Sequence, residues 1–115
     1  MKEPTLGNPQ NTIAVLQKYN FVFQKKFGQN FLIDTHVLDK IIGSAEITKD
    51  DFVLEIGPGI GTMTQYLACA AGKVAAVEID KALIPILEDT LDGYDNVQVI
   101  NEDVLKVDIA ELARS

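Results

Sequence analysis

The ten residues Phe52–Gly61 read FVLEIGPGIG, and this stretch indicates the fold of the chain. Its first half is apolar apart from Glu55, which is typical of a strand buried in a parallel sheet. Three glycines at alternate positions follow, where the backbone must turn sharply and can come close to a ligand. Thr62–Ala71 then has the composition of a helix, and Gly72 ends it. The stretch therefore predicts a strand, a glycine-rich turn and a helix whose N-terminus favours polar or negatively charged ligand groups.

The same alternation continues along the chain. Later segments predict a second strand, a helix with Pro85 near its first turn, a third strand and a final helical turn, at Val74–Ile79, Ala82–Leu91, Val97–Ile100 and Ile109–Ala113. Strands that alternate with helices indicate an α/β fold with a doubly wound parallel sheet, covered by helices on both faces. Only the first three strands of such a sheet are present. The first strand is expected to leave an open edge through which this chain can self-associate.

The residues before this pattern divide into two parts. We expect residues 1–24 to be a flexible lead with one short helix, Thr12–Tyr19, capped by Asn11 or Thr12. Residues 25–115 are expected to form the amino-terminal part of one ligand-binding domain. An ordered loop is predicted at residues 21–32, which spans the boundary between the two parts. A helix capped by Asp34 or Thr35 follows the loop. Its apolar face consists of Val37, Leu38, Ile41, Ile42 and Ala45.

Charge is distributed unevenly along the chain. The net charge is −7, but residues 1–49 carry six Lys against four acidic residues, whereas residues 50–115 carry four basic against thirteen acidic residues. Lys25 and Lys26 lie beside aromatic residues in the basic part, so they are candidates for contact with RNA phosphates, or else form a solvated basic turn.

The composition also excludes several classes of protein. No apolar run is long enough to span a membrane, and the polar Met1–Gln10 does not resemble a signal peptide. One cysteine and one histidine allow neither an internal disulfide nor a zinc site, so no metal is expected. These features predict a cytoplasmic protein that does not act on membranes.

Acidic residues follow each of the later strands. Glu78 ends the second strand, 19 residues after Gly59, where a carboxylate can accept both hydroxyls of a ribose. Asp103 follows the third strand, where it can accept the exocyclic amine of adenine while the backbone N–H of Val104 donates to a ring nitrogen. Each residue alone also fits a plainer role, a solvated strand end for Glu78 and turn chemistry for Asp103. Together with the glycines they predict a nucleoside site.

The glycine spacing distinguishes two kinds of nucleoside site. The dinucleotide fingerprint G-x-G-x-x-G requires glycine where Thr62 stands. The observed E-x-G-x-G-x-G, which begins at Glu55, resembles the loop of class I S-adenosylmethionine-dependent methyltransferases. Glu55 is acidic within an apolar strand and therefore needs a partner, and we expect it to hold the glycine loop or the adjacent backbone.

Four segments indicate one family within the class I methyltransferases. KKFGQNFLID, VLEIGPGIGTMT, VAAVEID and NEDVLKVD resemble, in order and spacing, the ribosomal RNA adenine dimethyltransferase family over about residues 25–108. The resemblance implies that the loop Gln29–Leu32 lies over S-adenosylmethionine. It also implies a set of cofactor-binding residues: Gln29, Asn30, Leu32, Gly57, Gly59, Glu78, Ile79, Asp103 and Val104.

The same resemblance implies a reaction and a partner. The family transfers two methyl groups to the exocyclic amine, N6, of each of two neighbouring adenosines near the 3′ end of small-subunit ribosomal RNA. GPGIGTMT is closer to this branch than to the related large-subunit enzymes of macrolide resistance. The family's catalytic motif, Asn or Asp followed by Leu-Pro and an aromatic residue, occurs nowhere in this chain. No catalytic residue is therefore expected before Ser115, and these residues alone are expected to be inactive.

Three alternatives remain open from the sequence. The chain could belong to a large-subunit ribosomal RNA dimethyltransferase or to a non-catalytic RNA-binding assembly factor built on the same scaffold. A nicotinamide-dependent dehydrogenase is the third, which Thr62 and the Gln29–Leu32 loop argue against.

Overall fold

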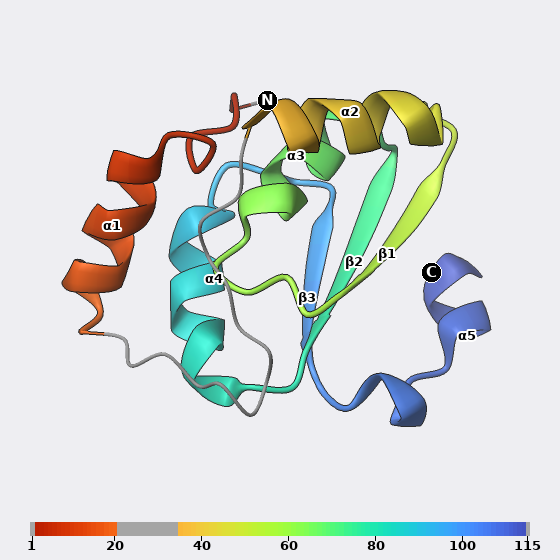
Figure 1. Cartoon of the computed structure of the whole chain (residues 1–115). Helices are drawn as coiled ribbons and strands as arrows, with labels where there is room; N and C mark the ends of the chain where they lie inside the picture. Colours follow the sequence, from red (N-terminus) through yellow and green to blue (C-terminus); the bar gives the residue numbers. More distant parts are fainter. Residues whose placement is uncertain (1, 21–34, 115) are drawn as a thin grey trace.

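Three parallel strands form the centre of the molecule in the order β1-β2-β3 (Figure 1). The computed structural model describes residues 2–20 and 35–114, in which the strands are β1 (Phe52–Ile56), β2 (Lys73–Glu78) and β3 (Val97–Asn101). In register, Ile56 lies opposite Val77, and Glu78 lies opposite Asn101. The carboxyl ends of all three strands therefore meet at one edge, and the predicted parallel α/β sheet is confirmed.

Helices lie on both sides of this sheet. Figure 1 shows α1, α3 and α4 on one side and α5 on the other, with α2 beside α3. Their bounds are Pro9–Lys18 for α1, Thr35–Ala45 for α2, Thr62–Ala70 for α3, Ile84–Thr90 for α4 and Ile109–Arg114 for α5, with short 3-10 helices η2 (Lys81–Leu83) and η3 (Val104–Lys106). Among the described residues, no helix is long and apolar enough to cross a membrane.

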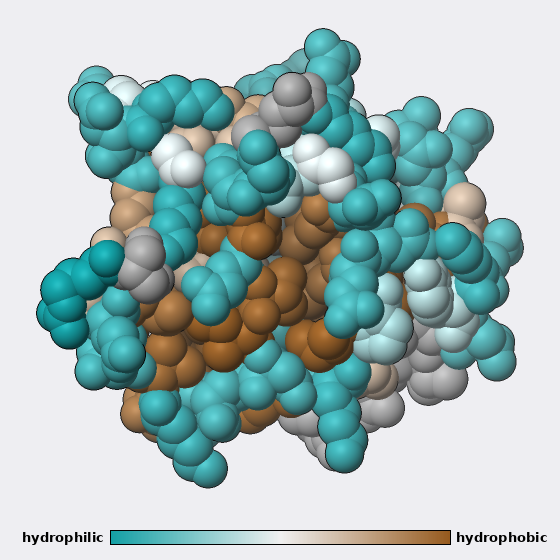
Figure 2. All heavy atoms as spheres, turned by 180° about the vertical axis from the view of Figure 1, so that it is seen from behind, coloured by the Kyte–Doolittle hydropathy of each residue, from teal (hydrophilic) through white to brown (hydrophobic). Residues whose placement is uncertain are grey.

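The main hydrophobic core lies between β2, α3 and α4. Val74 of β2, Leu67 of α3 and Leu87 of α4 are all buried members of one cluster. Both faces of β2 are buried, since Val74 and Ala75 on alternate faces are fully inaccessible, as expected for a central parallel strand. The edge strand differs: Ile56, at the end of β1, is 62% exposed. Seen from behind, the surface carries a broad area of apolar residues near its middle (Figure 2).

The sequence predicted most element boundaries to within one or two residues. β1 agrees at both ends, and α3 ends at Ala70 instead of Ala71. The helix expected at Ala82–Leu91 instead begins as the 3-10 turn η2 and continues as α4. Pro85 lies in the first turn of α4, where its missing N–H is tolerated, and Asp80 caps η2 by accepting from the N–H of Ala82 at 3.0 Å.

The first helix was predicted too late in the chain. α1 begins at Pro9, and its N-cap is Asn8, whose Oδ1 accepts from the N–H of Gln10 at 2.9 Å. A proline suits the first helical position because its absent N–H would have had no partner there. The predicted caps Asn11 and Thr12 are wrong, and Thr12 instead lies buried inside the helix.

Residues 2–8, which we call the strap, are also not the flexible lead that the sequence suggested. Leu6 is only 3% exposed and belongs to the main core. Its carbonyl accepts from the hydroxyl of Thr12 at 3.1 Å, so the strap and α1 hold each other. The predicted domain boundary after residue 24 and the loop 21–32 lie outside the described residues, and both stay predictions.

The apolar face predicted for α2 is only partly buried. Leu38 is fully buried and Ile42 packs against the core, but Val37 and Ile41 are exposed. The sequence pattern spread the face over two adjacent rows of the helix, and among the described residues the row of Leu38 and Ile42 is the one that packs against the core.

Candidate functional site

Three polar segments meet at the carboxyl edge of the sheet. The loop Gly57–Gly61 follows β1, Glu78 ends β2, and Asp103 follows β3 by two residues. In open parallel sheets, ligands bind outside the carboxyl ends of the strands. The structure therefore places the glycine loop, Glu78 and Asp103 of the predicted nucleoside site at the same edge of the sheet.

The glycine loop has a backbone conformation that other residues rarely adopt. Gly57, Gly59 and Gly61 have φ angles of +70°, +62° and +97°. The N–H of Gly57 donates to the carbonyl of Val77 at 2.9 Å, which fixes the start of the loop against β2. At Gly57 only the positive φ angle requires glycine, because a Cβ built there would meet no atom within 4 Å.

Gly61 has a second reason to be glycine. A Cβ at this position would lie 2.9 Å from Oγ1 of Thr90 and 3.3 Å from the side chain of Leu87. The loop is therefore open at Gly57 and packed against α4 at Gly61. Space for a ligand exists at the first glycine and not at the third.

Glu78 lies at the centre of this edge with 3% of its surface exposed. Its Oε1 accepts from the N–H of Gly59 at 3.2 Å, and its Oε2 accepts from the N–H of Asp80 at 2.9 Å. Burial raises the pKa of Glu78 above its ordinary value, while the hydrogen bonds from Asp80 and Gly59 act in the opposite direction. The carboxylate thus joins the glycine loop to the end of β2.

The neighbours of Glu78 set the shape of the edge. Ile79 is 54% exposed and forms an apolar surface beside the carboxylate. The side-chain amide of Asn101 donates to the carbonyl of Glu78 at 2.9 Å, which ties β3 to β2 at this point. Asn101 was not predicted. Its position opposite Glu78 becomes evident only from the strand register.

Asp103 caps the 3-10 helix η3. Its Oδ1 accepts from the N–H of Leu105 at 2.9 Å, and its own N–H donates to the carboxylate of Glu102 at 2.9 Å. Both Asp103 and Val104 are half-buried. The turn chemistry that the sequence allowed is therefore present. Contact with adenine stays a prediction.

Glu55 lies in β1, next to the strand that ends in Glu78, and its side chain accepts from the hydroxyl of Thr64 in the first turn of α3. Burial raises the pKa of Glu55 to about 7, the Thr64 bond partly opposes this, and the negative charge of Glu78 adds to it. Glu55 therefore has a partner, as expected, but the partner is a side chain of the helix after the loop and not the loop or the adjacent backbone expected from the sequence.

Several predicted site residues cannot be placed. Gln29, Asn30, Leu32, Lys25 and Lys26 lie outside the described residues. Their roles stay predictions.

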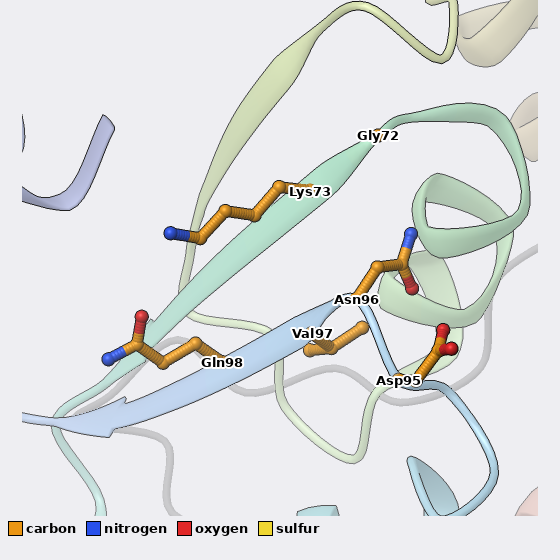
Figure 3. A pocket seen from close by; sticks show the side chains of 6 residues that line it. All are labelled: Gly72, Lys73, Asp95, Asn96, Val97 and Gln98. Atoms are coloured by element: carbon orange, nitrogen blue, oxygen red, sulfur yellow. The ribbon is translucent and has the colours of Figure 1, made fainter. Parts of the chain in front are cut away.

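A pocket lies at the opposite end of the strands. It is lined by Gly72, Lys73, Asp95, Asn96, Val97 and Gln98, at the amino ends of β2 and β3 (Figure 3). None of the predicted site residues lines it, so it is separate from the candidate site. In residues 2–20 and 35–114, no group of three or more His, Cys, Asp or Glu side chains could hold a metal ion.

Comparison with known proteins agrees with this geometry. The profile of the family described as "Ribosomal RNA adenine dimethylase" matches residues 20–115. The chain belongs to the ribosomal RNA adenine dimethylase family. The match includes the glycine loop and both acidic strand ends, so the resemblance stated from the sequence is confirmed.

Similar members of the family carry one name. A "Ribosomal RNA small subunit methyltransferase A" of Lachnoclostridium phytofermentans is 74% identical over 110 residues, which is 95% of this chain and 38% of that protein. The protein of the same name from Clostridioides difficile is 54% identical and is covered to the same extent. The chain therefore spans somewhat more than a third of the length of these relatives.

Solved structures of two methyl-transferring enzymes share the fold. The 23S rRNA methyltransferase ErmE has a TM-score of 0.64 and 40% identity, with 69% of this chain and 32% of that chain covered. A dimethyladenosine transferase from Plasmodium falciparum has a TM-score of 0.61 and 37% identity, with 66% and 28% covered. The fold of the described residues is therefore a partial class I methyltransferase fold.

Proposed function

We propose that this chain is the S-adenosylmethionine-binding part of an enzyme that dimethylates two adjacent adenosines near the 3′ end of small-subunit ribosomal RNA. The observation that carries the proposal is the contact between Gly59 and Glu78, which places a buried carboxylate against the glycine loop. Family membership and the names of the similar relatives support the same reaction.

The described residues fit the cofactor. Gly57 leaves open space at the start of the loop, where the backbone can approach a ligand closely. Glu78 would accept the ribose hydroxyls, and the exposed Ile79 would supply an apolar contact. Asp103 would accept the adenine amine, and the N–H of Val104 would donate to the ring.

Other parts of the proposed site rest on the family resemblance alone. Gly59 and the loop residues Gln29, Asn30 and Leu32 would complete the contacts to the cofactor. S-adenosylmethionine supplies an activated methyl group, and the protein contributes the position of the accepting amine. Because the catalytic motif is absent from the 115 residues, we propose that a polypeptide of residues 1–115 has no methyltransferase activity.

The choice of small-subunit RNA follows from the relatives. The two relatives described above, both named for the small subunit, are 74% and 54% identical to this chain, whereas the 23S enzyme ErmE is 40% identical. Dimethylation of large-subunit RNA is the second candidate. Because ribosomal RNA is the proposed substrate, the proposal puts the enzyme in the cytoplasm.

The dehydrogenase alternative lacks support at the loop. Thr62, which replaces the third glycine of the dinucleotide fingerprint, has a buried side chain. That third glycine normally allows close packing of helix and strand. A titration of the full-length protein with S-adenosylhomocysteine and with NADH separates the two, because tighter binding of NADH would overturn the proposal.

The proposal also includes contact between this chain and RNA. We expect Lys25 and Lys26 to contact RNA phosphates, and replacing both with Gln should lower the slope of log affinity against log salt by roughly two units. Lys81→Gln, at an exposed lysine in η2, serves as the control.

We also propose that the β1 edge, where Ile56 is exposed, allows residues 1–115 to self-associate. Light scattering of the purified polypeptide tests this.

The reaction itself is tested on ribosomal particles. Full-length protein should transfer methyl groups from labelled S-adenosylmethionine to immature small subunits and not to large-subunit RNA. Transfer to large-subunit RNA alone would favour the second candidate. If cofactor binds and neither RNA is methylated, the assembly-factor alternative replaces the enzyme.

A further inference from the structure

The strap, residues 2–8, is held to the domain by hydrogen bonds from several elements. The backbone N–H groups of Thr5 and Leu6 both donate to Oε1 of Gln65 in α3, each at 2.9 Å. The hydroxyl of Tyr94 donates to the carbonyl of Glu3 at 2.8 Å. The strap thus contacts residues about 60 and 90 positions later in the sequence.

Gln65 connects the strap to the end of α4. Its side chain is completely buried, although amides are seldom found inside proteins without partners. While Oε1 accepts from the strap, Nε2 donates to the carbonyl of Thr90 at 2.8 Å. One buried amide therefore hydrogen-bonds both the strap and the end of α4.

Thr90 connects this amide to the glycine loop. Its hydroxyl donates to the carbonyl of Ile60, which lies inside the loop, at 2.7 Å. The same hydroxyl is the atom that a Cβ at Gly61 would meet. Thr90 therefore supports the packed side of the loop, on the side away from the open space at Gly57.

The residues form a continuous series: Leu6, Gln65, Thr90 and Ile60. We propose that the strap is a positioning element for the glycine loop, acting through Gln65 and Thr90, so that docking of the strap increases affinity for the cofactor. This inference rests on the proposed function. Gln65 and Thr90 are positioning residues, because both are buried behind the loop.

The physical reason lies in the loop itself. Three glycines with positive φ give the loop many alternative conformations, so binding a ligand would require ordering it. A loop that is already held in one conformation avoids this loss of entropy on binding. Each buried hydrogen bond in the series favours the observed conformation, because breaking it would leave a buried polar group unpaired.

The first experiment removes one bond from the series. In the full-length protein, Thr90→Val deletes the hydroxyl that holds Ile60 and keeps the carbonyl that accepts from Gln65. We expect affinity for S-adenosylhomocysteine, measured by calorimetry, to fall about three- to tenfold. Thr90→Ser should restore it. Thr48→Val is the matched control, since it removes a hydroxyl whose hydrogen bonds, with Asp50 and Asp51, lie outside the strap and the loop.

The second experiment tests the connection between strap and loop. Leu6→Ala loosens the strap without removing any bond of the series, and it is combined with Thr90→Val. If the strap acts through Thr90, the two losses of affinity should be non-additive, with Leu6→Ala having little further effect in the Thr90→Val background. Additive losses would overturn the proposal.

A measurement without ligand separates this inference from the proposed function. The N–H of Gly61 donates to the carbonyl of Pro58 within the loop, so its hydrogen exchange reports on loop opening. Exchange should be faster in Leu6→Ala and in Thr90→Val than in Thr48→Val. If the unaltered protein fails to bind cofactor, the proposed function is wrong, while this exchange pattern still supports the strap. Equal exchange in all the variants would overturn the role of the strap.

Discussion

The carboxylate of Glu78 and the backbone N–H of Gly59 are 3.2 Å apart, although 19 residues separate them in the sequence. The same carboxylate also accepts from the N–H of Asp80, so both of its oxygens are engaged by backbone. The residue that would bind the ribose thus also shapes the loop that would lie beside the ribose. Its substitution should therefore affect both binding and local order.

Glu78→Ala should weaken binding of S-adenosylmethionine to the full-length protein by about 1–3 kcal/mol, because a charge-assisted acceptor is lost. Calorimetry measures the effect. Glu88→Ala, which removes an exposed carboxylate from α4, is the control and should bind normally. Unchanged affinity in Glu78→Ala would remove this residue from the site.

Asp103→Asn should relax the preference for adenosine over inosine in the cofactor, because an amide can donate to the inosine oxygen as well as accept from an amine. The test compares affinities for S-adenosylhomocysteine and its inosine analogue. Asp108→Asn is a matched control, since Asp108 also caps a helix, by accepting from the N–H of Glu111 at 3.0 Å. A variant at Asp103 that discriminates as well as the unaltered protein contradicts the assignment.

Alanine at two glycines of the loop should have different consequences. Gly61→Ala introduces a Cβ against Thr90 and Leu87 at positive φ and should lower the free energy of unfolding by about 2–4 kcal/mol. Gly57→Ala meets no neighbouring atom and should lower it by only about 1–2 kcal/mol. Its methyl group would instead enter the open space of the proposed site and reduce cofactor affinity. Chemical denaturation and calorimetry together check both effects, and equal loss of stability at the two positions would contradict the packing described.

Stability should fall as pH rises from about 4.5 to about 7 because of Glu55. Its pKa is raised from 4.5 to about 7 in the folded state, mainly by burial, so the unfolded chain releases its proton first. The folded state binds more protons in this range, and linkage gives a loss of about 3 kcal/mol across it. Glu78, whose pKa is also raised, contributes in the same direction.

Glu55→Gln isolates this contribution. The amide oxygen can still accept from Thr64, but it has no proton to lose. Urea denaturation at pH 5 and pH 7 should show a smaller difference for this variant than for the unaltered protein, whereas Glu111→Gln, on an exposed residue of α5, should show the original difference. A pH dependence that persists undiminished in Glu55→Gln would mean that Glu55 is ionised in the folded protein at both pH values.

The sequence predicted the sheet and the site edge well because both depend on local patterns. The strand Phe52–Ile56 and the glycines after it can be recognised from alternation and spacing alone. Parallel strands then bring Glu78 and Asp103 to the same edge without any further information. The partner of Glu55 could not be identified, because the choice of Thr64 depends on how α3 packs.

The strap was mispredicted for a related reason. Pro4, Gly7 and Pro9 indicate irregular backbone, and irregular backbone in a polar segment was interpreted as flexible. Gln65 accepts from two backbone N–H groups of the strap, and nothing in the sequence around position 65 shows that its side chain is buried. Contacts between residues 60 positions apart follow from tertiary packing and not from local composition.

The order of synthesis adds a consequence to this long-range contact. Each strand of the sheet pairs with the strand next to it in sequence, so β1, β2 and the helix between them can assemble while the chain is still growing. The strap leaves the ribosome before all of them, yet its partner Tyr94 is synthesised roughly 5–20 seconds later at ordinary rates of translation. The strap therefore cannot complete its contacts until Tyr94 has been made, and until then Leu6 lacks part of the core that buries it in the folded chain.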